Sequence, residues 1–386
     1  MMNSKNLELY LHIPFCVRKC AYCDFLSMPA EEKMLSEYVN CLLKEIKSHK
    51  EQEPEALVKS IFIGGGTPSL LPDGAVRTIM ALIKETFFIS PQAEITIETN
   101  PGTLTKEKLM EYQSVGINRL SIGLQSADNR ELKELGRIHS YEEFLENYQL
   151  AVQLGFQNIN VDLMSALPGQ TFKSWKETLR KVTELNPAHI SAYSLIIEEG
   201  TPFFHKYSEV EPADLPDEDL EREMYYFTKS YLQEKGYKHY EISNYAKPGY
   251  ECRHNIGYWT GVAYLGMGLG ASSYLDGCRF RNPDDLTGYK SHCEELYQLP
   301  MQAEKLTKAE QMEEFMFMGL RLIEGVSVTE FKKRFCKEID EVYGTEIGEL
   351  TVEGLLNNAN GFISFTERGL DLSNYVMAKF LEPKEI

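Results

Sequence analysis

Three cysteines stand within eight residues near the start of the chain. The segment CVRKCAYC places them at Cys16, Cys20 and Cys23. A disulfide would use two of these thiols and leave one over, and a tetrahedral zinc site takes four ligands. Three thiolates can instead hold three irons of a [4Fe–4S] cluster and leave the fourth iron open to another ligand. The spacing is compact enough to surround one such cluster.

Two alternatives to the cluster rest on the same residues. A zinc site would need a fourth ligand, for which His12 is the nearest candidate, although it falls within an expected strand. A chance grouping is disfavoured because a chain with 8 cysteines in 386 residues would rarely place three of them within eight positions. The other cysteines are scattered without pattern, at Cys41, Cys252, Cys278, Cys293 and Cys336. In a reducing compartment, clustered cysteines more often bind metal or take part in catalysis than form disulfides.

The first 200 residues alternate between two patterns. Short apolar, β-branched runs predict strands at 9–13, 60–65, 94–99, 119–124, 158–164 and 189–195. Amphipathic stretches between them predict helices at 32–48, 74–87, 106–116, 141–155 and 174–185. This alternation indicates βαβ units and a parallel sheet. Six such strands could curl into a partial (β/α)6 barrel or lie open as a doubly wound sheet.

The unusual polar and glycine-rich segments directly follow the predicted strands. The cysteines follow the first strand and GGGTPS (64–69) follows the second. Glu98 lies at the end of the third strand, Gln125 at the end of the fourth and Asp162 late in the fifth. Functional residues gather at the carboxyl ends of parallel strands in barrels and in open sheets alike. We therefore expect these residues to share one rim, as in a barrel active site.

The pattern changes after residue 205. Residues 206–304 form a connecting region, with a helix around 218–236 and a glycine- and tyrosine-rich segment over 244–280 that contains HNIGYW (254–259). From residue 305 helical patterns return and end in a short strand, a turn and a helix, which predicts a winged-helix-like module. We therefore expect three domains, at 1–205, 206–304 and 305–386.

Composition limits the class of protein. Hydrophobic residues make up 43% and charged residues 25%, as in ordinary soluble globular proteins. The formal net charge of −18 argues against a nucleic-acid-binding surface and disfavours general adsorption to anionic lipid. We read no signal peptide at the start and no apolar run long enough for a membrane helix. The expected location is the cytoplasm.

The cysteine segment also carries a resemblance. CVRKCAYC, with Tyr22 just before its last cysteine, resembles the signature of the radical S-adenosylmethionine (SAM) superfamily, and GGGTPS resembles that family's glycine-rich segment. The resemblance implies that the open iron of a [4Fe–4S] cluster chelates the amino and carboxylate groups of SAM. It also implies an α/β fold: a partial (β/α)6 radical-SAM barrel with a C-terminal α+β region ending in the winged-helix-like module.

Further segments resemble one branch of that superfamily. They are YLHIPFC (10–16), ETNP (98–101), GLQS (123–126), LGRIHS (135–140) and VDLMSALPGQT (161–171), and they are similar to coproporphyrinogen III dehydrogenases and HemW-type haem chaperones. By matched position, the resemblance implies SAM contacts from Tyr10, Gly65, Gly66, Thr67, Glu98, Gln125, Arg137 and Asp162. The residue types suit that role, because carboxylates accept from ribose hydroxyls or the ammonium and an arginine can clamp the carboxylate.

Two differences separate those two families. The dehydrogenases carry a further cysteine two residues after the third cluster ligand and have a longer N-terminal extension. Here Phe25 occupies that place, as in HemW-type proteins, and only nine residues precede Tyr10.

HNIGYW resembles the HNxxYW segment of HemW-type proteins, which implies haem contacts from His254, Asn255, Tyr258 and Trp259. A neutral imidazole can ligate haem iron, and aromatic rings can cover a porphyrin face. Without the resemblance, a histidine packed between aromatics would be the plainer interpretation.

The sequence therefore predicts a haem chaperone that binds haem, a [4Fe–4S] cluster and SAM and passes haem to acceptor proteins, some of them membrane-bound. The resemblance suggests that the cluster supports a homodimer or haem transfer. The alternative is an oxygen-independent coproporphyrinogen III dehydrogenase, which would use a 5′-deoxyadenosyl radical. A third hypothesis is a zinc-stabilised α/β binding protein, so enzymatic activity stays an open question.

Overall fold

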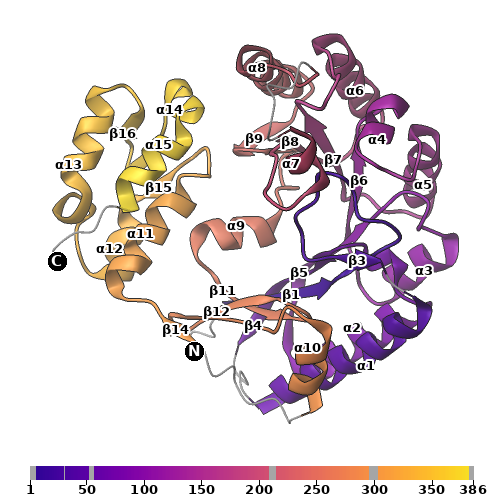
Figure 1. The fold of residues 1–386 in the computed structure, drawn as a ribbon. Coiled ribbons are helices and arrows are strands. Elements are labelled where there is room, and N and C mark those ends of the chain that lie inside the picture. Colours follow the sequence, from indigo (N-terminus) through magenta and orange to yellow (C-terminus); the bar gives the residue numbers. More distant parts are fainter. Residues whose placement is uncertain (1–5, 30, 52–55, 208–213, 295–302, 382–386) are drawn as a thin grey trace.

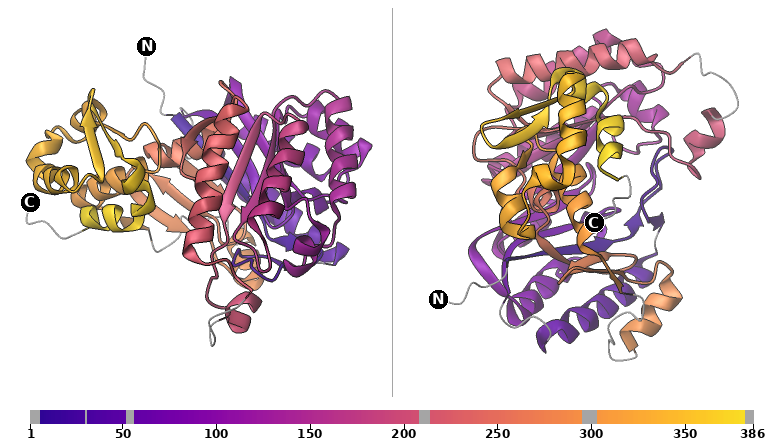
Figure 2. Two further views of the ribbon diagram at one scale, coloured as in Figure 1. Left: turned by 90° about the horizontal axis from the view of Figure 1, so that it is seen from above. Right: turned by 90° about the vertical axis from the view of Figure 1, so that its left-hand side faces the viewer.

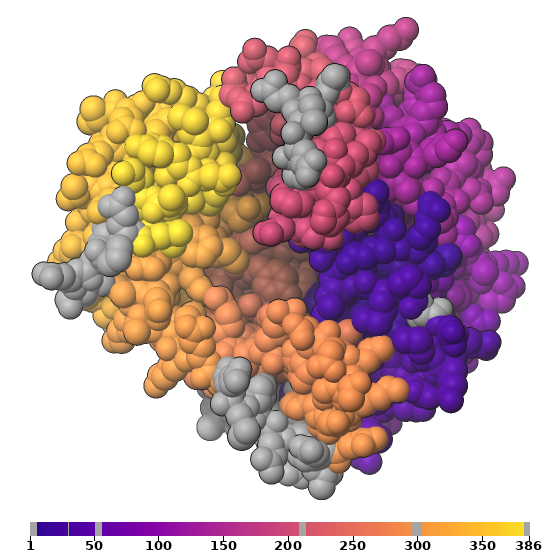
Figure 3. All heavy atoms as spheres, in the orientation of Figure 1, coloured from indigo at the N-terminus to yellow at the C-terminus, as the bar shows by residue number. Residues whose placement is uncertain are grey.

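The computed structural model describes residues 6–29, 31–51, 56–207, 214–294 and 303–381 of the chain (Figure 1). A large sheet lined on its outside by helices forms one body, and a smaller C-terminal body, yellow in the figures, stands beside it (Figure 2). On one face of the molecule a broad hollow lies between the two bodies (Figure 3).

Six parallel strands form the centre of the large body. In order across the sheet they are β1 (Asn6–Ile13), β4 (Leu57–Gly65), β5 (Phe88–Thr99), β6 (Arg119–Gln125), β7 (Ile159–Ser165) and β8 (His189–Ser194). Among the described strands, β1 and β8 do not pair with each other, so the barrel is partial, as predicted. All six strands expected from the sequence are confirmed, and three of them (β1, β4 and β5) begin earlier than expected.

The expected helices cover the outer face of these strands. They are α1 (Glu32–Ser48), α2 (Ala75–Thr86), α3 (Lys106–Ser114), α5 (Tyr141–Gln153) and α6 (Phe172–Glu184). Local sequence fixes several of their starts, because Ser140 and Thr171 accept N–H bonds from the first turns of α5 and α6 and so satisfy donors that have no partner in the helix. The short helix α4 (Asn129–Glu134), capped by Asp128, was not foreseen.

The connecting region extends the sheet at both edges, which the sequence did not indicate. Strand β11 (Ala263–Met267) pairs in parallel with β1, and β12 (Ser272–Leu275), β13 (Cys278–Arg281) and β14 (Glu304–Lys305) continue antiparallel. At the other edge, β10 (Asn244–Ala246) and β9 (Lys238–Glu241) follow β8. These strands are short and rich in glycine or polar residues, so periodicity alone does not reveal them. Helices α7 (Pro202–Tyr207), α8 (Glu218–Glu234), α9 (Arg253–Thr260) and α10 (Leu286–Glu294) lie between them.

The C-terminal body has the predicted winged-helix-like arrangement. Helices α11 (Lys308–Gly319), α12 (Val328–Phe335) and α13 (Ile339–Val352) pack against a small antiparallel sheet of β15 (Val326–Ser327), β17 (Phe362–Phe365) and β16 (Leu356–Ala359), followed by α14 (Glu367–Asp371) and α15 (Ser373–Ala378). It has a hydrophobic core of its own that includes Phe331, Ile363 and Phe380. Within the described ranges, no helix combines the length and apolar character needed to cross a bilayer.

Candidate functional site

The three clustered cysteines lie on a loop tied down at its base. The loop begins at β2 (Phe15–Cys16) and ends at β3 (Met28–Pro29), and these two short strands pair in parallel. Further along, the N–H of Ala21 donates to the carbonyl of Leu135, and the carbonyl of Ala21 accepts from the N–H of Phe203. The loop is therefore anchored to segments that follow β6 and β8, at the carboxyl-end rim of the barrel.

All three thiols line one cavity of about 450 Å³, which we call the cluster cavity. They are free and partly exposed, so a cluster could reach them. The Thr67 hydroxyl lies 3.7 Å from Cys16 Sγ, and Arg137 Nη1 lies 3.7 Å from Cys20 Sγ. Donors to sulfur of this kind also tune clusters held by thiolates. The residues present therefore fit a [4Fe–4S] cluster held by Cys16, Cys20 and Cys23.

Across the described part of the chain, no three His, Cys, Asp or Glu side chains converge as the ligands of one metal ion do. A [4Fe–4S] cluster makes no such demand, because each cysteine ligates a different iron. His12, the fourth ligand that zinc would require, is occupied elsewhere. Its Nε2 lies 2.8 Å from the carbonyl of Leu26, and its Nδ1 lies 2.9 Å from the Tyr10 hydroxyl. His12 thus braces the end of the cysteine loop.

Seven of the eight predicted SAM residues line the same cavity: Gly65, Gly66, Thr67, Glu98, Gln125, Arg137 and Asp162. The two glycines are needed for local geometry. Gly65 has a φ of +111°, and a Cβ on Gly66 would lie 2.6 Å from the Phe15 carbonyl oxygen. Gln125 adopts a φ of +74° at the end of β6, a strained conformation of the kind found at functional sites.

The charged members of this set, Glu98, Asp162 and Arg137, are half-buried in the wall of the cavity. Burial and, to a lesser degree, the nearby Asp162 carboxyl together raise the pKa of Glu98 to about 8. Burial also raises the pKa of Asp162, although Asn160 and Ser121 donate hydrogen bonds to it. Arg137 donates through Nη2 to Asn100 Oδ1 and to the Gly123 carbonyl, both at 2.6 Å, while its buried Nε has no partner. The cavity therefore offers acceptors and an unpaired cationic donor to a ligand with amino and carboxylate groups.

A second, smaller cavity of about 210 Å³ continues into the barrel interior; we call it the inner cavity. Glu98 and Asp162 line both cavities, so the two share a boundary. Tyr10, the eighth predicted SAM residue, lines the inner cavity rather than the cluster cavity. A contact between Tyr10 and SAM therefore stays a prediction.

The HNIGYW segment forms α9, which the sequence did not predict as a helix. The N–H groups of Arg253 and His254 donate to Glu94 at 3.1 and 3.2 Å, and Gly257 packs so closely on Glu8 that a Cβ there would lie 1.9 Å from its Oε1. Glu8 and Glu94 lie on β1 and β5, on the amino-terminal side of the rim residues Tyr10 and Glu98. Helix α9 therefore lies at the amino ends of the strands, away from the cysteine loop.

His254 is buried, with 1% of its surface exposed. Its Nδ1 lies 2.8 Å from Ser60 Oγ and its Nε2 lies 3.1 Å from the Tyr258 hydroxyl. Burial, with the positive charge of Arg119, lowers the pKa of His254 to about 3, so the ring stays neutral. Because both nitrogens have partners, ligation of haem iron by His254 would require the Tyr258 bond to break. The predicted role of His254 as an iron ligand stays untested.

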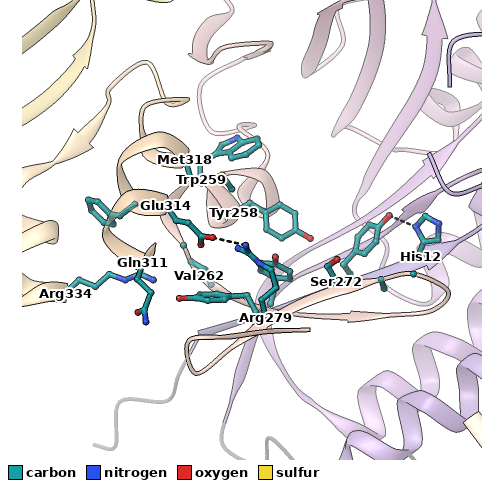
Figure 4. Close-up of a pocket in the computed structure, with 17 residues that line it drawn as sticks. His12, Tyr258, Trp259, Val262, Ser272, Arg279, Gln311, Glu314, Met318 and Arg334 are labelled. Carbon is teal, nitrogen blue, oxygen red and sulfur yellow. Dashed lines mark hydrogen bonds and ion pairs between the residues drawn. The ribbon is translucent and has the colours of Figure 1, made fainter. Parts of the chain in front are cut away.

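A third cavity of about 410 Å³ lies between the extended sheet and the C-terminal body (Figure 4); we call it the lateral pocket. Its sides come from β1, β11, β12 and β13 below, with α11, α12 and, beside α11, α9 opposite them. Figure 3 shows the surface hollowed over this region, between the yellow C-terminal body, the orange strands and the indigo cysteine loop. Tyr258 and Trp259 line the lateral pocket, whereas His254 and Asn255 line the inner cavity.

Comparison with known proteins identifies the family of the chain. Residues 10–182 match the radical SAM superfamily and residues 306–372 match the HemN C-terminal domain. A protein named heme chaperone HemW from Lactococcus lactis is 36% identical to this chain, and the match covers 98% of each. The Bacillus subtilis protein of that name is 35% identical over 96% of this chain and 98% of its own length. The Escherichia coli protein of that name is 36% identical over 99% of this chain and 100% of its own length. The chain belongs to the HemW haem-chaperone family.

The fold agrees with that assignment. A solved structure of coproporphyrinogen III oxidase (HemN) from Escherichia coli, a radical SAM enzyme, superposes with a TM-score of 0.86 over 98% of this chain and 90% of that one. Sequence identity is 24%, so the likeness concerns the fold alone. The HemW family membership and the partial barrel both match what the sequence motifs predicted.

Within this HemW-family chain, the structure adds residues that sequence reasoning did not single out. Asn100 connects two of the predicted SAM residues, since its amide donates to Thr67 Oγ1 at 2.7 Å and accepts a hydrogen bond from Arg137. Its place in ETNP, directly after a strand, was a usable signal. Arg279 and Arg334 line the lateral pocket together with Tyr258. No local pattern marks them, because they come from β13 and α12, far from HNIGYW in the sequence.

Proposed function

We propose that this chain is a haem chaperone that binds haem, one [4Fe–4S] cluster and SAM, and that it delivers haem to acceptor proteins. Full-length similarity to proteins named heme chaperone HemW supports the haem role. The observation that carries the cofactor part is the placement of three free thiols in the same cavity as Arg137 and Glu98.

The residues for each cofactor follow from this placement. Cys16, Cys20 and Cys23 would hold three irons of the cluster, and the fourth iron would take the amino and carboxylate groups of SAM. Arg137 would clamp the SAM carboxylate through its unpaired donor, and Glu98 would accept a hydrogen bond from the ligand. Thr67 and Asn100 would hold Arg137 in a fixed position relative to the cysteine loop.

Phe25 favours the chaperone over the dehydrogenase. Its side chain lines the cluster cavity, with 59% of its surface exposed. Coproporphyrinogen III dehydrogenases have a further cysteine at the position of Phe25. An aromatic ring there offers no sulfur ligand or hydrogen-atom donor. Haem contact through Tyr258 and Trp259 is part of the proposal, with His254 holding Tyr258 in place.

The mouth of the cluster cavity suits a second copy of the chain. Five of the large hydrophobic side chains that are more than a third exposed line this one cavity: Val17, Phe25, Ile138, Tyr193 and Ile196. A contiguous exposed apolar patch often marks an interaction surface, whereas single exposed hydrophobic residues are normal on any protein. We therefore propose that a homodimer forms across the cluster mouth and shields the cluster from solvent.

The proposal is tested with protein whose cluster has been reconstituted under anaerobic conditions. One half is titrated with haem and followed by its Soret band; the other half receives coproporphyrinogen III, SAM and a reductant. Stoichiometric haem binding without a decarboxylated product supports the chaperone. Formation of protoporphyrinogen without tight haem binding would overturn it in favour of the dehydrogenase. Iron and acid-labile sulfide contents decide between a cluster and zinc.

A further inference from the structure

The lateral pocket has two facing walls of similar character. The sheet contributes Tyr264 and Tyr274. Opposite, α11 presents Gln311, Phe315 and Met318 at helical spacing, while its neighbouring residues Met312 and Met316 are buried in the core of the C-terminal body. Aromatic side chains thus line both walls of a slot between two bodies. Such a slot suits a flat apolar ligand, because rings on either side can lie along its faces.

Two arginines reach this pocket. Arg279, on β13, makes an ion pair with Glu314 of α11 at 2.8 Å, and Arg334, on α12, donates to the Thr260 carbonyl at 3.3 Å. In the view of Figure 4, Arg334 and Gln311 lie toward one end of the pocket, His12 and Ser272 lie toward the other, and the Arg279–Glu314 pair lies between them. Guanidinium groups are the side chains best shaped to pair with carboxylates. In a chain of net charge −18, two of them beside an aromatic slot indicate an anionic ligand.

We infer that the lateral pocket is the haem site, with Arg279 and Arg334 pairing the two propionates. The inference rests on the proposed haem-binding function and adds the location and the carboxylate partners. A volume of about 410 Å³ lies within the roughly 300–1,000 Å³ typical of small-molecule and cofactor pockets. Because Glu314 already occupies Arg279, a propionate would displace Glu314 when haem enters.

The position of α9 agrees with this location. One face of Trp259 is covered by the Arg321 guanidinium at 4.4 Å, and the indole lines the lateral pocket. Tyr258 and Tyr10 each line both the lateral pocket and the inner cavity, so together they form a partition between them. Haem would therefore lie across this partition from the inner cavity, and the inner cavity borders the cluster cavity proposed for SAM at Glu98 and Asp162.

The experiment uses the full-length, cluster-reconstituted protein and compares haem with haem dimethyl ester, in which both propionates are esterified. We expect Arg279→Gln combined with Arg334→Gln to weaken haem binding at least tenfold and to leave binding of the ester unchanged. Arg222→Gln, on the exposed surface of α8, is the matched control. Glu314→Gln frees Arg279 and is expected to tighten haem binding severalfold, a change that misfolding cannot produce.

The outcomes separate the inference from the proposed function. If the wild type binds haem and the arginine and Glu314 variants match it, the lateral pocket is not the propionate site, while the chaperone proposal stands. If the wild type binds no haem, the proposed function fails and the inference fails with it. Ser272→Trp tests location alone: its side chain is exposed at the pocket, and a bulky ring there is expected to exclude both haem and the ester.

Discussion

The Nε2 atom of His254 lies 3.1 Å from the hydroxyl oxygen of Tyr258, one helical turn further along α9. The same imidazole lies 2.8 Å through Nδ1 from Ser60 on β4 and stacks on Phe62 with ring centroids 5.1 Å apart. The motif histidine is thus built into the barrel floor, and Tyr258 is the residue through which it reaches the lateral pocket.

This relationship predicts how His254→Ala behaves. We expect haem affinity to fall by up to about tenfold, the worth of roughly one hydrogen bond, because Tyr258 loses its support. The position of the Soret band is expected to stay unchanged, since no iron ligand is removed. His205→Ala, an exposed histidine on α7, is the control. A shifted Soret band in His254→Ala would instead show that His254 ligates the iron after leaving Tyr258.

Removal of one cluster ligand is expected to remove the cluster. Cys20→Ser leaves two thiolates for a cluster that needs three, so iron and sulfide contents after anaerobic reconstitution should fall to a small fraction of the wild-type values. Cys336→Ser, on the exposed end of α12, should retain both. Full iron content in Cys20→Ser would contradict the proposed ligand set.

Arg137→Gln tests the SAM clamp. Hydrogen bonds to charged groups contribute about 1.5–3 kcal/mol, so we expect SAM binding at least about tenfold weaker by calorimetry on cluster-loaded protein. Because Arg137 also lies near Cys20, iron content is measured on the same sample. Arg130→Gln, whose side chain is 89% exposed, is the matched control. Unchanged SAM affinity with a full cluster would exclude the clamp.

The buried Glu8 predicts a dependence of stability on pH. Burial raises its pKa from 4.5 in the unfolded chain to about 9 in the folded protein, so the folded state holds the proton more tightly. The contribution of Glu8 to the free energy of unfolding is complete below pH 4.5 and is lost as pH rises toward 9. The free energy of unfolding then falls by at most about 1.4 kcal/mol per pH unit. Denaturant unfolding at pH 7 and at about pH 9 should show a smaller loss in Glu8→Gln than in the wild type. The pKa of His254 falls from 6.5 in the unfolded chain to about 3 in the folded protein, so its effect on stability lies mainly below pH 7, outside this comparison. If both proteins lost the same free energy of unfolding between these pH values, the ionisation of a group other than Glu8 would cause the loss.

Ile196→Glu tests the proposed dimer. Ile196 is 68% exposed at the mouth of the cluster cavity, and a charge there would have to be desolvated in an interface between two copies. We expect sedimentation of cluster-loaded protein to shift from dimer to monomer. Val352→Glu, 89% exposed on the C-terminal body, should leave the dimer intact. A monomeric wild type would end the dimer proposal without affecting the cofactor assignments.

The sequence by itself determined the elements and the rim. Alternating apolar runs and amphipathic stretches predicted the six barrel strands and five of their helices, because strand and helix periods are local properties of a chain. It also grouped seven of the eight predicted SAM residues that share the cluster cavity, since residues that follow parallel strands must meet at one edge of the sheet, but Tyr10 lines the inner cavity instead. The spacing of Cys16, Cys20 and Cys23 needed no long-range information.

The tertiary structure alone decided how the HNIGYW segment is used. Read along the chain, its four predicted haem residues form one group; folded as α9, they divide between two cavities, with His254 on one side and Trp259 on the other. The edge strands β11–β13 and helix α11 bring Arg279 and Glu314 to the same pocket from separate parts of the chain. Burial and long-range packing fix which atoms of a motif are free to bind, and these depend on contacts between segments that no local pattern encodes.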